Sequence, residues 1–436
     1  MNIEEIREKI LSDRELVTAH DYFDRDFSIK EVRGMATCIV GGRRTGKTSY
    51  LKRYARKLIN NGLEKERICY LSFFTSDDTN FPFSFISDAY FSLYPDFKTE
   101  EVYFFLDEIE KIPSWGGGVS YMMEKYPLSH VFITGSSAKY LSLEIPTELR
   151  GRSLSWRFYP LSFREFLSFN GVTYNSADGA YSSSDQALLT HWFTEYMERS
   201  SYPVLYDNTD REVRKLTLSS YFDTVFSRDL IERYDVSRGA LMKALLKRMV
   251  KNSGSPYTIR KLMAAMKSMG YSTSIELISS YLDMMVTSSF MISVPIYGTE
   301  KQVERNNKKM YGIDHQMAVL YREFDKGTGI ILEHIVLMEL RRRTSLNIAY
   351  YRSKNDTECD FILYDDDKTP VLLVQVTDDY EKSKERELRG LVSAMKETGL
   401  KKGYIVTSYS SEVIRENEWE IRVIPAWKFA LDNSVI

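Results

Sequence analysis

Short apolar runs, separated by longer stretches of helical periodicity, dominate the first 170 residues. The runs lie at 36–40, 68–74, 102–106, 130–134 and 154–158. Runs of this length without strict alternation are typical of strands buried on both faces, and the helical stretches between them indicate parallel pairing. We therefore predict an α/β domain over residues 1–170, built on a parallel sheet with helices on both faces.

The hydrophobic pattern changes after this domain. Residues 171–190 are rich in Gly, Ser, Asn and Asp and predict an exposed loop. Apolar residues at helical spacing follow over 191–235, so we predict a helical connector over 171–237. Three further helical stretches and two strand-like runs then predict a winged-helix domain over 238–327.

The last segment, residues 328–436, alternates helix and strand patterns in a different order. The predicted elements are a helix at 329–343, strands at 348–352, 359–364 and 371–377, a helix at 383–398 and a strand at 403–407. This order predicts a separate α/β lobe.

Composition limits the classes of protein that remain. The chain has 436 residues, 43% of them hydrophobic, and a net charge of −2, so any basic surface must be local. Its three cysteines, Cys38, Cys69 and Cys359, are far apart, so neither a disulfide framework nor a zinc site is indicated. The charged N-terminus has no signal-peptide core, and no apolar run could span a bilayer. We expect a cytoplasmic protein without a membrane partner.

A phosphate-binding loop is indicated between the first strand and the helical stretch 49–60. Glycines let backbone N–H groups turn toward phosphate oxygens, and the helix N-terminus stabilises the anion. Lys47 is expected to contact the β- and γ-phosphates of ATP, and the Thr48 hydroxyl to ligate Mg²⁺. The predicted ATP-binding residues are Gly41, Gly42, Arg43, Arg44, Thr45, Gly46, Lys47, Thr48 and Ser49.

Two acids follow the apolar run 102–106, at a strand end where open α/β folds bind ligands. Asp107 is expected to hold Mg²⁺, directly or through water. Glu108 is expected to orient and polarise the attacking water as general base. Ser136 follows the next strand and is a candidate contact for the γ-phosphate or that water; a serine N-cap is the alternative.

An arginine that stabilises transition-state charge is expected near residue 150. Arg152 is the first candidate and Arg150 the second, acting in cis or from a neighbouring subunit. The alternative is that both are ordinary surface residues. The oligomeric state stays open.

These motifs together resemble a known family. The quoted segments are GGRRTGKT, FFLDEIEKIPSW, ITGSSAKYL, LRGR and PLSFREFL, the last at residues 160–167. Their order resembles the AAA-superfamily ATPases of archaea and bacteria that have a C-terminal domain of unknown function. The resemblance implies ATP binding and hydrolysis, a winged-helix element, and a C-terminal lobe similar to restriction-type nucleases.

The C-terminal lobe departs from the nuclease pattern D…(D/E)-x-K. Asp360 matches the first carboxylate, with Glu333 and Glu358 as further acids, but Gln375 and Thr377 replace the second acid and the lysine. These neutral side chains supply neither a metal ligand's charge nor an ammonium group. We therefore predict a degenerate nuclease-like site at Glu333, Asp360 and Gln375. The candidate substitutes for the missing lysine are Lys354, Lys382 and Lys384.

The stretch from Arg238 to Ile275 contains eight basic residues and no acidic ones. Such a patch favours sequence-independent contact with DNA phosphates. Against this, the third helical stretch of the winged-helix domain contains Glu276 and Asp283 and no Lys or Arg. Packing between domains is therefore the alternative. The candidate DNA contacts are Lys247, Arg248, Lys251, Arg260 and Lys261.

Taken together, the patterns predict a P-loop NTPase domain, then a helical and winged-helix region, then a restriction-nuclease-like α/β lobe. The first functional hypothesis is a Mg²⁺-dependent ATPase coupled to DNA binding. The alternatives are a nucleotide-gated switch with little turnover and an ATP-regulated DNA nuclease.

Overall fold

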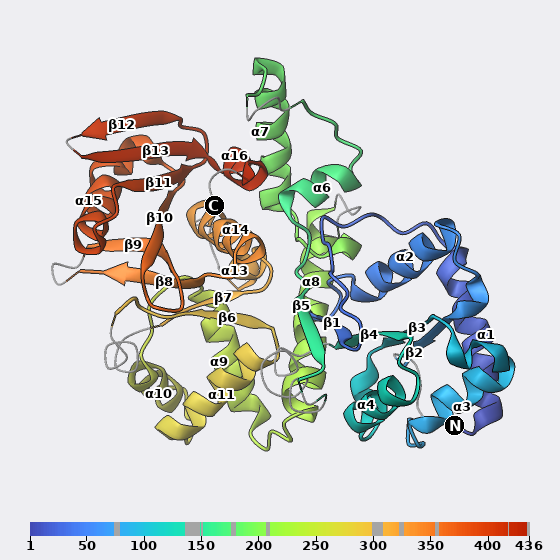
Figure 1. Ribbon diagram of the computed structural model, residues 1–436. Coiled ribbons are helices and arrows are strands. Elements are labelled where there is room, and N and C mark those ends of the chain that lie inside the picture. The colour runs from blue at the N-terminus through green and yellow to red at the C-terminus, as the bar shows by residue number, and fades with distance from the viewer. Residues whose placement is uncertain are drawn as a thin grey trace. The chain divides into compact units, whose positions relative to one another are not determined.

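The chain forms two compact units, Met1–Tyr159 with Thr287–Ser289, and Pro160–Val286 with Phe290–Ile436. Figure 1 shows the elements of each. The computed structural model describes residues 1–73, 79–135, 149, 151–175, 180–205, 210–298, 308–321, 327–353, 357–416 and 418–433. Each unit is described by itself.

The first unit contains a five-stranded sheet. Its strands are β1 (Ala36–Val40), β2 (Ile68–Ser72), β3 (Val102–Asp107), β4 (Ser129–Gly135) and β5 (Ser153–Arg157). They pair in the order β2-β3-β4-β1-β5, and every pair is parallel. The predicted parallel sheet is confirmed. Because β4 lies between β3 and β1, the carboxyl ends of these three strands are neighbours.

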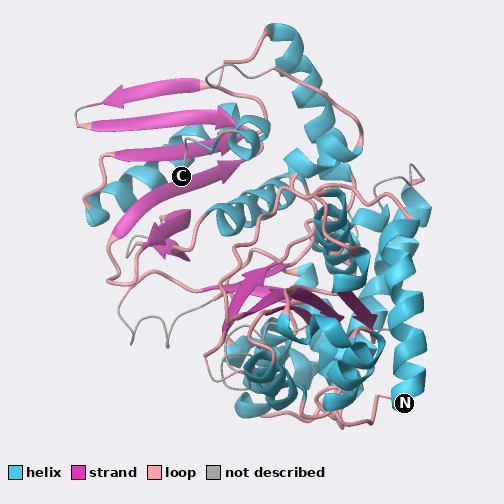
Figure 2. Ribbon diagram, turned by 45° about the vertical axis from the view of Figure 1, so that its right-hand side comes forward, coloured by secondary structure: helices cyan, strands magenta, loops and turns pink. Residues whose placement is uncertain are grey.

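Helices cover both faces of this sheet (Figure 2). Neighbouring strand residues belong to different cores: Cys38 packs with α3 and α4, whereas Ile39 packs with Leu51 of α2. Burial on both faces explains why these strands appear as continuous apolar runs. The helical segments are α1 (Ile3–Ala19), α2 (Lys47–Asn60), α3 (Ser84–Leu93), α4 (Trp115–Lys125), and short 3-10 turns at Lys65–Arg67, Pro95–Thr99 and Ile109–Lys111.

The second unit begins with helices. They are α6 (Phe163–Phe169), α7 (Ser183–Glu198), a 3-10 turn (Pro203–Leu205), α8 (Arg211–Val225), a π-helical segment (Phe226–Glu232), α9 (Gly239–Lys251), α10 (Ile259–Ser268) and α11 (Ile275–Thr287). The antiparallel hairpin β6 (Met291–Val294) and β7 (Lys309–Gly312) follows, then α13 (Met317–Leu320). The predicted order of three helices and two strands is confirmed.

The loop predicted over 171–190 is wrong in its last part. Ser182 caps α7 by accepting a hydrogen bond from the Asp185 backbone N–H, so the helix begins inside the polar stretch. The serines that favoured a loop are the helix start, because a serine hydroxyl satisfies an otherwise unpaired N–H there.

The segment 160–167 packs within the second unit. Ser162 and Glu165 form a capping box at the start of α6. The Tyr196 hydroxyl of α7 donates to the Leu161 carbonyl at 2.7 Å, and Arg342 donates to the Pro160 carbonyl at 2.8 Å. The segment therefore joins α6 and α7 to the helix that contains Arg342.

The C-terminal lobe is a six-stranded mixed sheet with helices. Its elements are α14 (Thr328–Arg343), β8 (Asn347–Arg352), β9 (Glu358–Tyr364), β10 (Pro370–Thr377), α15 (Tyr380–Thr398), β11 (Lys402–Thr407), β12 (Glu412–Glu416), β13 (Trp419–Pro425) and α16 (Ala426–Leu431). The strand order is β12-β13-β11-β10-β9-β8. The predicted order from α14 to β11 is confirmed. The sequence reading missed β12, β13 and α16, of which the edge strand β12 is mostly charged and exposed.

In the described parts of the chain, no helix combines the length and apolar character needed to cross a membrane.

Candidate functional site

The loop after β1 is shaped by two glycines. A Cβ at Gly41 would lie 2.0 Å from the Phe158 carbonyl oxygen, so only glycine fits beside β5. Gly46 has φ 100°, a left-handed conformation that favours glycine, and α2 begins directly after it. The Thr45 hydroxyl donates to the Gly42 carbonyl at 2.9 Å and closes the turn. The predicted strand, loop and helix are all present.

Thr48 and Asp107 come together although 59 positions separate them. The Thr48 hydroxyl donates to Asp107 Oδ2 at 2.8 Å, and Asp107 is fully buried at the end of β3. A hydroxyl and a carboxylate this close fit a Mg²⁺ ion that keeps most of its water and takes few protein ligands. These are the two residues predicted to hold the metal.

Thr134, near the end of β4, is a contact that the sequence reading missed. Its hydroxyl donates to Asp107 Oδ1 at 2.6 Å and accepts from the Glu108 backbone N–H at 2.8 Å. Glu108 has φ 57°, a left-handed conformation uncommon for a residue with a side chain. Thr134 therefore joins the two acids and fixes the backbone that aims Glu108.

Burial shifts the pKa of both charged groups next to the loop. Lys47 is buried, and its ammonium donates to the Gly41 and Gly42 carbonyls at 2.8 and 2.9 Å. Burial lowers the pKa of Lys47, and the nearby Glu108 opposes this shift. Burial, with the charge of Glu110, raises the pKa of Glu108. A raised pKa suits a carboxylate that must accept a proton.

Arg25, before β1, supports the loop from outside. It donates to the Thr45 carbonyl at 2.9 Å and to the Tyr159 carbonyl at 2.8 Å, and its guanidinium lies 4.4 Å from the Phe158 ring centroid. No motif marks this arginine, because its partners are backbone carbonyls up to 134 positions away.

The predicted contacts of Ser136, Arg150 and Arg152 with the γ-phosphate or the transition state are only partly supported. Ser136 and Arg150 lie outside the described residues. Arg152 precedes β5, whose first residue pairs with Ala36 at the start of β1, so it lies at the sheet edge opposite the loop. A contact in cis is therefore not supported for Arg152, whereas donation to a neighbouring subunit stays a prediction. Arg157, paired with Val40 at the loop edge, was missed.

Comparison with known proteins agrees with this geometry. A family model described as an AAA domain matches residues 33–167. The chain contains an AAA domain. A second model, described as a domain of unknown function (DUF4143), matches residues 328–429. The predicted family resemblance and the P-loop NTPase fold of the AAA domain are confirmed.

Two relatives align with most of the chain. An uncharacterized protein of Methanocaldococcus jannaschii is 29% identical over 434 residues, which is 97% of this chain and 94% of the relative. An uncharacterized protein of Haemophilus influenzae is 28% identical over 375 residues, 83% of this chain and 86% of the relative. Neither name gives an activity.

Solved structures are similar only at low scores. A Walker-type ATPase of Pyrococcus abyssi is 12% identical, has a TM-score of 0.37, and the match covers 74% of this chain and 95% of that one. The ORC1 protein of Aeropyrum pernix in complex with DNA is 12% identical, has a TM-score of 0.29, and the match covers 74% and 91%. Likeness of this size supports no conclusion about function.

Outside the AAA domain, the five predicted DNA contacts are all exposed. Lys247, Arg248 and Lys251 lie within two turns of α9, and Arg260 and Lys261 lie in the first turn of α10. The Lys247 ammonium lies 5.3 Å from the Tyr321 ring centroid. Another cation of the stretch, Lys243, pairs with Asp223 at 2.8 Å. The basic face is therefore smaller than the sequence count indicates.

In the C-terminal lobe, the structure brings Glu333, Asp360 and Gln375 together. The Asp360 backbone N–H donates to Gln375 Oε1 at 3.2 Å. Both acids share the ammonium of Lys309, at 3.2 Å from Glu333 and 3.5 Å from Asp360. The predicted substitute lysines do not fill this role: Lys382 pairs with Asp379, Lys384 pairs with Glu412, and Lys354 lies outside the described residues.

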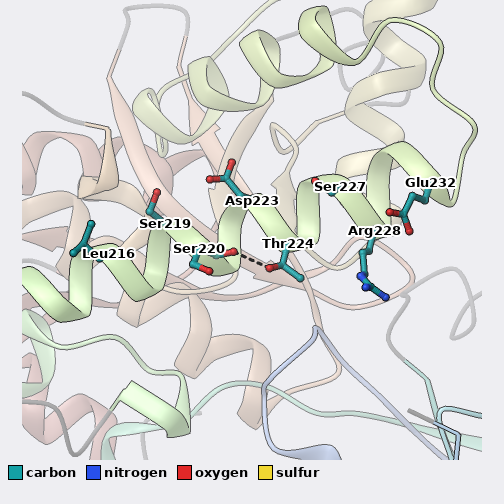
Figure 3. Close-up of a pocket in the computed structure, with 8 residues that line it drawn as sticks. All are labelled: Leu216, Ser219, Ser220, Asp223, Thr224, Ser227, Arg228 and Glu232. Atoms are coloured by element: carbon teal, nitrogen blue, oxygen red, sulfur yellow. Dashed lines mark hydrogen bonds between the residues drawn. The ribbon is translucent and has the colours of Figure 1, made fainter. Parts of the chain in front are cut away.

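An open hollow of about 570 Å³ lies along α8 and the π-helical segment (Figure 3). Asp223, Arg228 and Glu232 are its charged lining residues, and Asp223 is paired with Lys243. The rest of its lining is Leu216 and hydroxyl side chains from the same helix. The Thr224 hydroxyl donates to the Ser220 backbone carbonyl and not to a carboxylate of the lining, so we assign the hollow no reaction.

Proposed function

We propose that the AAA domain binds ATP with Mg²⁺ and hydrolyses it. The observation that supports this most is the 2.8 Å hydrogen bond between the Thr48 hydroxyl and Asp107 Oδ2, beside the buried Lys47 and Glu108. Four side chains with the chemistry of phosphoryl transfer meet at the carboxyl ends of neighbouring strands.

Each of these residues has a distinct role in the proposal. The backbone of the loop and the Lys47 ammonium bind the β- and γ-phosphates. The N-terminus of α2, the positive end of the helix dipole, stabilises the same negative charge. Glu108 orients the attacking water and accepts its proton. Thr48 and Asp107 hold Mg²⁺. Bound Mg²⁺ supplies charge that offsets the negative charge on the phosphates.

The experiment that tests this proposal replaces Lys47 by Ala and measures ATP binding and hydrolysis. Binding should weaken strongly and hydrolysis should disappear, because the phosphate charge loses its nearest cation. Lys57→Ala is the matched control, since Lys57 lies exposed on the same helix. Wild-type hydrolysis in Lys47→Ala would contradict the proposal.

A nucleotide-gated switch with little turnover is the competing function. It predicts tight ATP binding with negligible phosphate release in the wild-type protein. Steady-state phosphate release in the presence and absence of Mg²⁺ distinguishes the two. The buried Asp107 and Glu108 at one strand end favour turnover, because a switch needs no general base.

We further propose that the basic face of α9 and α10 contacts the DNA backbone without reading sequence. The exposure of Lys247, Arg248 and Lys251 on one helix supports this. Phosphate contacts of this kind give affinity that falls with salt. Packing between domains is the alternative for the same surface.

For the C-terminal lobe, we propose that it does not cut DNA by a two-carboxylate mechanism. Gln375 accepts from the Asp360 backbone and donates to Glu387 Oε2 at 2.6 Å, so a neutral amide occupies the position of the second acid. Mn²⁺-dependent cleavage by the wild-type protein that is absent in Asp360→Ala would contradict this and favour an ATP-regulated nuclease.

A further inference from the structure

The most unusual charged group in the described residues outside the AAA domain is Lys309. Its side chain is 2% exposed, and its ammonium lies 2.7 Å from Glu358, 3.2 Å from Glu333 and 3.5 Å from Asp360. Burying an ammonium is costly unless several partners surround it. Here three carboxylates do so.

The cation and the acids come from different parts of the second unit. Lys309 is the first residue of β7, Glu333 lies on α14, and Glu358 and Asp360 lie on β9. Tyr311, also on β7, donates to Glu333 Oε1 at 2.5 Å. Two side chains of the β6–β7 hairpin therefore enter the acid cluster of the C-terminal lobe.

The same hairpin is also hydrogen-bonded to the loop between the basic helices α9 and α10. The Gly254 N–H, in the loop after α9, donates to the Met310 carbonyl at 2.9 Å, and the Tyr257 N–H donates to the Lys308 carbonyl at 3.0 Å. Toward the lobe, the Tyr297 N–H donates to the Tyr350 carbonyl of β8 at 2.7 Å. The hairpin thus connects α9 and α10 to the sheet.

Further contacts hold Asp360 and the loop beside Glu333 in place. Asp360 Oδ2 accepts from the Val376 N–H at 2.9 Å. A Cβ at Gly254 would lie 2.2 Å from Ile330 Cδ1 and 3.5 Å from Glu333 Oε2, so the loop packs directly against α14. Burial and the charge of Glu333 raise the pKa of Asp360 to about 8, opposed by Lys309. Lys309 is the cation that the described ion pairs place against all three of these acids.

We propose that Lys309 is an internal ionic latch, which holds the β6–β7 hairpin on the C-terminal lobe and closes the acid cluster to divalent cations. No described group of three or more His, Cys, Asp and Glu side chains is arranged to hold a metal ion. An ammonium at 2.7–3.5 Å from three carboxylates occupies the space that such an ion would need.

The first test measures thermal stability and amide hydrogen exchange in the full chain. Lys309→Met keeps the length of the side chain and removes its charge. The melting temperature should fall by roughly 10 °C, because breaking a buried pair leaves uncompensated charge. Exchange at the Tyr297 amide, which bonds to β8, should speed up at least tenfold. Lys308→Met, exposed on the same hairpin, should change neither.

A charge-matched double variant separates a latch from simple charge balance. Lys309→Met with Glu358→Gln restores the formal charge of the cluster. A latch predicts that the double variant regains part of the melting temperature while the Tyr297 amide stays unprotected. Recovery of that protection would overturn the latch.

The second test titrates Mn²⁺ in the absence of nucleotide. Lys309→Ala should gain a Mn²⁺-dependent rise in melting temperature beyond any rise in the wild type, and this gain should disappear in Lys309→Ala with Asp360→Ala. An equal rise in the wild type, or no rise in Lys309→Ala, would overturn the claim that the ammonium keeps divalent cations out.

Discussion

One hydroxyl group, that of Thr134, joins the two acids of the nucleotide site. It donates to Asp107 and accepts from the Glu108 backbone, so it couples the proposed metal ligand to the proposed base. It contacts both residues through a single oxygen that is buried between β3 and β1. We assign Thr134 a positioning role.

Replacing Thr134 by Val should lower ATP turnover by about 10–100-fold, the range expected for losing a hydrogen bond to a charged group. ATP binding should change little, because Thr134 does not belong to the loop. Thr134→Ser keeps the hydroxyl and should restore most of the turnover. Steady-state kinetics with separate KM and turnover values check this. Equal loss in both variants would point to packing instead of the hydroxyl.

The pH dependence of turnover should reflect two shifted groups. The base Glu108 must be ionised, so activity is lost as pH falls through its raised pKa. Lys47 must be charged, so activity is lost as pH rises through its lowered pKa. Both limbs of the pH–rate profile should therefore lie closer to neutral pH than the pKa values of an ordinary carboxyl and amine would place them. A profile without an acid limb would contradict the assignment of Glu108.

From the sequence, candidate site residues could be predicted where they lie close together along the chain. Lys47 and Thr48 follow from one loop, and Asp107 and Glu108 from one strand end. Thr134 and Lys309 could not be predicted, because their partners lie 24 to 51 positions away and are set by the strand order and by the packing of the hairpin. Arg25 could not be predicted either, because its hydrogen bonds to the Thr45 and Tyr159 carbonyls follow no residue pattern.

The helix α9 exposes three cations, Lys247, Arg248 and Lys251, in its last two turns. Met242, Leu245 and Met249 are buried, while Lys247 and Arg248 are exposed. The apolar stripe fixes the helix in the second unit and leaves the cations outside. An element of this kind suits either phosphate contact or a neighbouring acidic surface.

Replacing Lys247, Arg248 and Lys251 by Ala should weaken DNA binding and reduce the salt slope by up to about three, since each lost phosphate contact lowers the slope by about one. Binding should not depend on sequence. The control is Lys396, Lys401 and Lys402 replaced by Ala, all exposed in the C-terminal lobe. Unchanged binding in the α9 variant, or no binding at low salt, would support the packing alternative.

At the scale of the whole chain, strand prediction was most complete where both faces are buried and least complete at a charged edge strand. The mostly buried strands β1 to β4 of the AAA domain were found within a residue or two. The edge strand β12 was missed because its charged residues face solvent. The start of α7 was missed because its serine cap resembles a loop.

The core of the second unit should make stability depend on pH. His334 is fully buried near Tyr311, Asp314 and His315, and burial lowers its pKa to about 4. In the unfolded chain His334 binds a proton near pH 6.5, whereas in the folded chain it stays neutral until about pH 4. Stability should therefore fall as pH drops from about 6.5 to 4, by about 3 kcal/mol in total for this group.

Urea unfolding across this pH range measures the effect. His334→Leu should flatten the dependence by about one proton, equivalent to about 1.4 kcal/mol per pH unit. His191→Gln, exposed on α7, should leave it unchanged. The same slope in His334→Leu as in the wild type would assign the dependence to other groups.

The most direct test of the ATPase proposal is turnover by Glu108→Gln under saturating ATP and Mg²⁺, compared with the wild type and with Glu124→Gln, an exposed acid of the same unit. The account predicts that Glu108→Gln binds ATP as the wild type does, while phosphate release falls by about two to four orders of magnitude. Glu124→Gln should release phosphate normally. Wild-type phosphate release by Glu108→Gln would contradict the assignment of this carboxylate as the base.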